Sequence, residues 1–150
     1  MRKFFLSHGQ NIHSYEIEKF AHDQKLEIPI EYIKFLTDVN GGIPHKQIFN
    51  LREFDSNKDN PNTFIMIEEF LSFQQLSEAW SYVKHELSTF NLIPIADVRG
   101  GMLICCKQSD EMDRTDAKLF FYDMNFGIVK LTNKMLDFLN LLITKEVMND

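Results

Sequence analysis

The fold is decided first by IPIEYIKFLTDVNGG, residues 28–42. Pro29 suits the opening of a helix, because its ring presets φ and its missing N–H would have no partner within the helix. Apolar residues then recur with helical spacing on one face, at Tyr32, Phe35, Leu36 and Val39. Asn-Gly-Gly at 40–42 ends the helix, because glycine accepts the left-handed conformation of a C-terminal cap. We therefore expect a β-branched residue at Gly41 to damage the fold.

A second informative stretch is LIPIADVRGGMLICC, residues 92–106. Two apolar runs flank Gly100 and Gly101, which can supply the positive φ of a tight turn, so the stretch predicts a β-hairpin. Cys105 and Cys106 are neighbours in the second run. Successive side chains of a strand point to opposite faces, so we expect no disulfide between them and a role as small buried hydrophobes.

The rest of the chain alternates between helical and strand patterns. Helices are predicted over 15–24 with Ser14 as N-cap, over 76–87 with Trp80 in the core, and after Thr132 as N-cap. The last helix has an apolar stripe formed by Met135, Leu136, Leu139, Leu142 and Ile143. Strands are predicted over 48–54, 63–70, 119–122 and 128–131. We expect one α+β domain spanning residues 1–150, mainly antiparallel β-sheet with helices packed around it.

The order and spacing of these pieces resemble the SUKH superfamily of Smi/Knr-like domains. The resemblance rests on the proline-started helix that ends in Asn-Gly-Gly, and on the later Ile-Pro-Ile-Ala-Asp strand with its Gly-Gly turn. It extends to the amphipathic segment 15–20, the Phe-Phe-Tyr-Asp strand at 120–123 and the closing helix. It implies the Smi/Knr-like fold. Family members often carry Asp after the Gly-Gly turn and an acidic residue after the next strand, where this chain has Met102 and Lys107.

Composition narrows the classes of function. The net charge is −6, which argues against nucleic-acid binding, because such binding needs cations placed against phosphates. No apolar run approaches the length of a signal peptide or a membrane span, so we expect a cytoplasmic protein that does not enter a membrane.

The sequence contains no complete motif for a metal site, a cofactor site or a catalytic site. Asp55-x-Asn57-x-Asp59 imitates the start of an EF-hand calcium loop, but that loop needs Gly at its sixth position and Glu at its twelfth, where this chain has Asn60 and Met66. The histidines and cysteines lack the spacing of a zinc site. The Gly-Gly pairs do not precede helices, as a phosphate-binding loop requires. We expect no metal, no cofactor, no catalytic residue and no enzymatic activity.

One charged feature remains as a candidate binding surface. Four acidic residues cluster in an expected loop between two strands, and two further acidic residues lie in the predicted strand 63–70. The candidate partner-binding residues are Asp110, Glu111, Asp113 and Asp116, with Glu68 and Glu69 as weaker candidates. Many bacterial members of the resembled superfamily are immunity proteins that neutralise a cognate toxin, often a basic nuclease or deaminase. The resemblance thus implies a non-enzymatic immunity protein that blocks a basic toxin by steric and electrostatic means.

An alternative function is an intracellular regulatory or scaffolding module, like the eukaryotic relatives in cell-wall signalling. Those proteins carry the domain within longer chains with disordered arms. For the immunity role, we expect reversal of the loop charges to slow association with the partner and to leave the melting temperature nearly unchanged.

Overall fold

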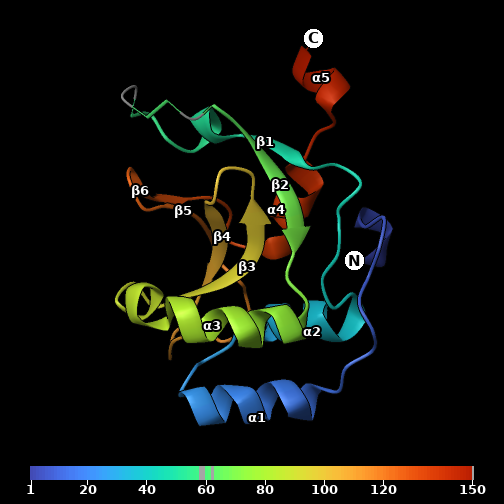
Figure 1. The fold of residues 1–150 in the computed structure, drawn as a ribbon, viewed down its shortest axis with the longest axis vertical. Helices are drawn as coiled ribbons and strands as arrows, with labels where there is room; N and C mark the ends of the chain where they lie inside the picture. The colour runs from blue at the N-terminus through green and yellow to red at the C-terminus, as the bar shows by residue number, and fades with distance from the viewer. Residues whose placement is uncertain (58–59, 62, 150) are drawn as a thin grey trace.

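The strands follow one another in space in the same order as in the sequence. The computed structural model describes residues 1–57, 60–61 and 63–149. Within these residues the strands form one six-stranded antiparallel sheet (Figure 1). They are β1 (Ile48–Asn50), β2 (Phe64–Phe70), β3 (Leu92–Val98), β4 (Leu103–Lys107), β5 (Leu119–Asp123) and β6 (Gly127–Lys130). With helices packed around this sheet, the predicted α+β class is confirmed.

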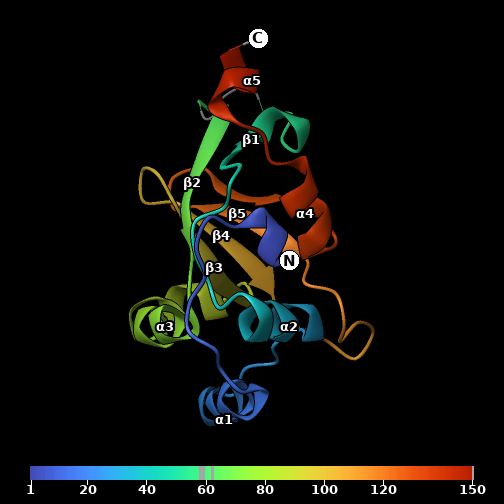
Figure 2. The same ribbon diagram turned by 90° about the vertical axis from the view of Figure 1, so that its right-hand side faces the viewer.

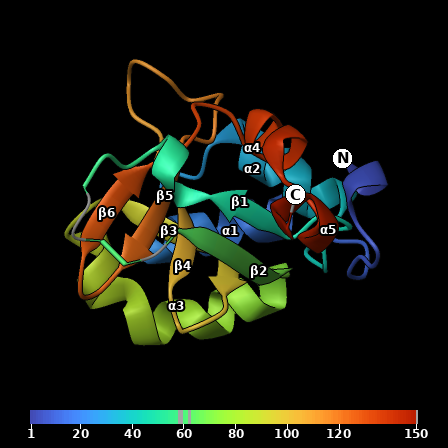
Figure 3. The same cartoon turned by 90° about the horizontal axis from the view of Figure 1, so that it is seen from above.

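Helices cover both faces of the sheet. They are α1 (Ser14–Gln24), α2 (Ile30–Asp38), α3 (Phe73–Ser88), α4 (Met135–Leu141) and α5 (Lys145–Asn149), with 3-10 turns η1 (Arg2–Phe4) and η2 (Leu51–Glu53). Figures 2 and 3 show α3 on one side of the strands and α2 and α4 on the other. α1 packs against α2 at the far end of the molecule from α5. The core is rich in aromatic contacts between the layers, such as Phe49 with Phe138 of α4, whose ring centroids are 5.2 Å apart.

α2 forms as its sequence pattern predicts. The four apolar residues of its predicted face, Tyr32, Phe35, Leu36 and Val39, are all buried. Pro29 is the N-cap and not the first helical residue. The chain then passes through positive φ at Asn40 (53°), Gly41 (81°) and Gly42 (129°).

The two glycines are needed for close approach as well as for conformation. A Cβ on Gly41 would lie 2.5 Å from the backbone nitrogen of Ser72, and one on Gly42 would lie 2.1 Å from the carbonyl oxygen of Ser7. Asn40 adds two hydrogen bonds, because its Nδ2 donates to the carbonyl of Gln10 and its Oδ1 accepts from the backbone N–H of Phe73. The motif therefore joins the N-terminal segment and the start of α3 to the end of α2.

The predicted hairpin is also confirmed. β3 and β4 pair directly, and Gly100 and Gly101 have φ of 96° and 84° in the turn between them. Cys105 and Cys106 are free thiols, both fully buried. Trp80 is a core residue of α3 with 3% of its surface exposed.

Several element ends differ from prediction. The N-cap of α1 is His13, one residue before Ser14, and it forms a capping box with Glu16. The strand predicted over 48–54 stops at Asn50, where the Asn50 side chain accepts a hydrogen bond from the backbone of Arg52 and the chain turns into η2. Asp59 of the calcium-like sequence lies outside the described residues.

The last predicted helix is in fact two helices with a different cap and a different buried face. Lys134, and not Thr132, is the N-cap of α4. Leu136 is 42% exposed, whereas Phe138 is fully buried in its place. The chain leaves α4 at Leu142, and Ile143 pairs with Ile48 of β1 before α5 begins. Contact with the sheet edge thus ends the helix that the apolar stripe alone would continue.

Candidate functional site

In the acidic loop, residues 108–118 between β4 and β5, two carboxylates stabilise the loop backbone through hydrogen bonds. Asp110 accepts hydrogen bonds from the backbone N–H groups of Met112 and Asp113. Asp113 in turn accepts from those of Thr115 and Asp116. Hydrogen bonds to the ionised form favour it, so these backbone donors lower the pKa of Asp110 and of Asp113. We therefore expect reversal of either charge to disturb the loop, whereas for the other loop carboxylates an unchanged melting temperature stays a prediction.

The loop is fastened to the start of α2. The backbone N–H groups of Ile30 and Glu31 donate to the carbonyls of Arg114 and Thr115, at 3.0 and 2.8 Å. Ser109 donates through its backbone N–H to the carbonyl of Glu27. A hollow of about 210 Å³ lies beside this junction, lined by Glu27, Ser109, Asp110, Glu111 and Arg114. Glu111 is exposed and Asp116 half-buried. Neither of these two carboxylates has a hydrogen bond or ion pair within the described part of the chain.

Glu68 and Glu69 belong to a second acidic group that includes a residue missed by the sequence analysis. Glu69 in β2 is the register partner of Asp97 in β3. Burial, followed by the charges of Glu69 and Glu68, raises the pKa of Asp97. The side chain of Glu69 accepts a hydrogen bond from Gln75 of α3 at 3.1 Å. No Lys or Arg of the described residues forms an ion pair with these three carboxylates. The pairing of β2 with β3, which is irregular between Ile67 and Glu69, brings Asp97 beside Glu69. The sequence alone does not show this pairing, so it could not assign Asp97 to the second acidic group.

The six predicted binding residues therefore fall into two separate groups. Asp110, Glu111, Asp113 and Asp116 lie in the loop that is bonded to α2. Glu68 and Glu69 lie on the strand whose Glu69 is bonded to α3. Figures 2 and 3 show α2 and α3 on opposite sides of the sheet, so the two groups are attached to helices of different layers.

Glu31 is an acidic residue with a structural task that the sequence did not reveal. Its Oε1 accepts hydrogen bonds from the backbone N–H groups of Ala117 and Met135, both at 2.9 Å, and its Oε2 accepts from that of Leu136 at 3.2 Å. Two of these donors belong to the first turn of α4, where no residue of the same helix can satisfy them. A carboxylate of α2 thus caps α4 and also holds the end of the acidic loop.

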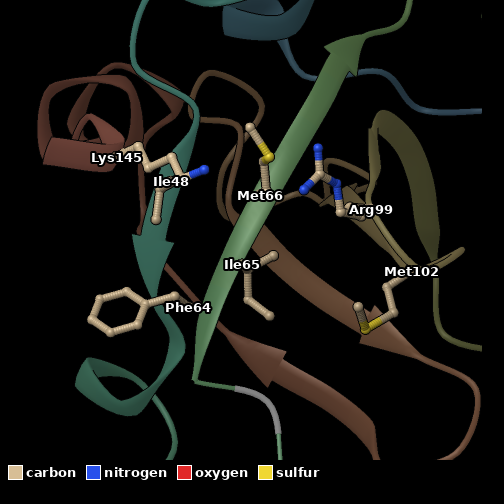
Figure 4. A pocket seen from close by; sticks show the side chains of 7 residues that line it. All are labelled: Ile48, Phe64, Ile65, Met66, Arg99, Met102 and Lys145. Carbon is tan, nitrogen blue, oxygen red and sulfur yellow. The ribbon is translucent and has the colours of Figure 1, made fainter. Parts of the chain in front are cut away.

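An apolar groove is the third feature of interest. It has a volume of about 350 Å³ and is lined by Ile48, Phe64, Ile65, Met66, Arg99, Met102 and Lys145. In Figure 4 the Arg99 and Lys145 side chains stand on opposite sides of β2, with Met66 between them. Phe64 is 44% exposed at the edge of the groove. Sequence analysis did not find this site, because its residues come from β1, β2, the β3–β4 turn and α5.

Neither a metal cluster nor a membrane segment is found in the described part of the chain. There, no three His, Cys, Asp or Glu side chains are placed to hold a metal ion. Each described helix is too short or too polar to span a membrane. Burial raises the pKa of the Cys105 and Cys106 thiols, so both stay protonated and unreactive at neutral pH.

The model of the SMI1 / KNR4 family (SUKH-1) matches residues 11–141. A search of curated proteins finds no match.

Proposed function

The chain belongs to the SMI1 / KNR4 family (SUKH-1), and from that membership and its uncompensated carboxylates we propose that it is an immunity protein. It binds a cognate toxin domain, a basic nuclease or deaminase, and blocks its active site or an adjoining surface. The chain itself carries out no reaction. Binding is steric and electrostatic.

The observation that carries the proposal is that Glu69 and Asp97 are register partners beside Glu68, and that no Lys or Arg of the described residues forms an ion pair with these three carboxylates. Burial, and after it the repulsion from Glu69 and Glu68, raises the pKa of Asp97. A Lys or Arg from a partner would relieve that repulsion on binding. An acidic surface also speeds encounter with a basic partner, by about 10–10³-fold at low salt.

The acidic loop supports the proposal in a different way. The Asp110 and Asp113 carboxylates accept hydrogen bonds from backbone N–H groups, and these bonds together with the junction with α2 hold the loop in place. A preordered loop loses less conformational entropy when a partner binds. Glu111 and Asp116 keep their carboxylates available, since neither has a partner within the described residues.

The test uses the product of the neighbouring gene, because an immunity gene normally lies beside its toxin gene. We expect this chain to bind that protein and to protect cells that produce it. Glu68→Lys, or Glu111→Lys with Asp116→Lys, is expected to slow association by about tenfold and to flatten its salt dependence. Asp110 and Asp113 are left unchanged, so that the loop keeps its structure.

A matched control is Glu18→Lys, a charge reversal at an exposed position of α1 that belongs to neither acidic group. It is expected to leave the association rate within about twofold, since an exposed charge outside the contact surface is largely screened at physiological salt. Failure of the chain to bind or protect would refute the immunity function. Binding with equal rates for all variants would refute the acidic contact surface alone.

A further inference from the structure

The apolar groove across β1 and β2 has a charge opposite to that of the molecule as a whole. The chain carries a net charge of −6, yet both charged residues that line the groove, Arg99 and Lys145, are cations. Both are exposed, and neither forms an ion pair or a side-chain hydrogen bond with any residue that the structure describes.

The floor of the groove is suited to an apolar side chain. Met66 and Met102 contribute two flexible thioethers, which adapt to irregular shapes, and Phe64 exposes part of its ring at the edge. Covering these groups would remove apolar surface from water, which favours binding. Figure 4 shows one cation on each side of β2, so a ligand lying on Met66 would have a cationic group on either flank.

We propose that this groove binds a segment of a partner protein in which an apolar side chain is adjacent to a carboxylate. The apolar side chain packs on Met66 and Met102, and the carboxylate pairs with Arg99, whose planar guanidinium suits carboxylate geometry. Glu68 lies further along β2, so the carboxylate is directed toward the Arg99 and Lys145 flanks and away from Glu68. This contact is independent of the acidic surfaces proposed above and has the opposite charge preference.

The experiment uses the whole chain labelled with ¹³C at its methionine methyl groups. The probe is the acetylated, amidated peptide Gly-Glu-Leu-Phe-Asp-Gly. Two matched peptides serve as comparisons, one with Lys in place of both acids and one with Ser in place of Leu and Phe. Met112 and Met124, 93% and 76% exposed, report non-specific binding elsewhere on the surface.

We expect the acidic apolar peptide to shift the methyl signals of Met66 and Met102 and to leave those of Met112 and Met124 in place. Arg99→Gln is expected to weaken this binding by about fivefold, as for an ion pair at a partly covered site. The control Arg114→Gln removes the same charge from the acidic loop and is expected to change nothing. Both variants should keep the melting temperature, because neither side chain makes a hydrogen bond or ion pair within the described residues.

Four results would overturn the proposal. The first three are equal shifts with the Lys peptide, equal affinity for Arg99→Gln, and no shift at Met66 or Met102 with any peptide. The fourth is a shift of Met66, Met102 and Met112 together as the protein alone is concentrated. In that case the groove would bind the acidic loop of a second copy and not a partner segment.

Discussion

Removing the Glu31 carboxylate should destabilise the fold far more than loss of an ordinary surface acid. Three backbone N–H groups donate to this carboxylate. Two of them belong to Ala117 and Met135, which are fully buried, whereas Leu136 is 42% exposed and its N–H can turn to water. A buried donor that loses its partner costs about 1–3 kcal/mol, so the two buried donors together should make Glu31→Ala lower the free energy of unfolding by about 2–6 kcal/mol. That is a large part of the roughly 5–15 kcal/mol that holds a typical domain together.

A graded pair of substitutions makes the reasoning on Glu31 specific. Glu31→Gln keeps an oxygen that can accept from both buried donors, so we expect it to cost only about 1–2 kcal/mol. Glu18→Ala on the exposed face of α1 is the control and should stay within about 0.5 kcal/mol of the parent.

Urea unfolding measures all three proteins, with equal slopes confirming that only stability has changed. If Glu31→Ala cost less than about 1 kcal/mol, or no more than Glu31→Gln, the proposed cap of α4 would be wrong.

Three further predictions test the local geometry. Gly41→Ala should cost at least about 2 kcal/mol more than Gly101→Ala, because both have positive φ but only a Cβ at 41 meets backbone atoms; urea midpoints give the difference, and equal costs would contradict the close approach. Tyr32→Phe should raise the free energy of unfolding by about 1 kcal/mol, because the buried Tyr32 hydroxyl has no partner among the described residues; a loss of stability would mean that the hydroxyl is bonded. Asp97→Asn should raise the melting temperature at pH 7, since the raised pKa of Asp97 makes the folded protein bind a proton more tightly than the unfolded chain and stability falls as pH rises through that range. The advantage should vanish below the unfolded pKa of about 3.9, and an advantage that persists there would refute the electrostatic cause.

Helices and strands could be predicted from the sequence where apolar residues recur at regular spacing or a Gly-Gly pair marks a turn. The four apolar residues of α2 are all buried, and Trp80 lies in the core of α3 as its spacing indicates. The Gly-Gly turn gives the hairpin of β3 and β4. These features depend on residues a few positions apart, for which backbone geometry and helical or strand periodicity are sufficient.

For the candidate binding residues, the sequence showed which side chains are acidic but not which of them form hydrogen bonds within the fold. A count of acidic residues in 110–116 cannot separate Asp110 and Asp113, which accept backbone hydrogen bonds, from Glu111 and Asp116. Asp97 joined the second acidic group only through the pairing of β2 with β3. The apolar groove was not anticipated at all, because its lining residues come from segments far apart in the chain.

The sequence by itself determined the α+β class, the positions of α1, α2 and α3, the hairpin of β3 and β4, and the family to which the chain belongs. Only the tertiary structure decided how α4 is capped, which acids have a structural task, and where unpaired cations flank an apolar surface. The physical reason is distance along the chain. Glu31 and Met135 are 104 residues apart, so no local pattern can encode that their atoms meet.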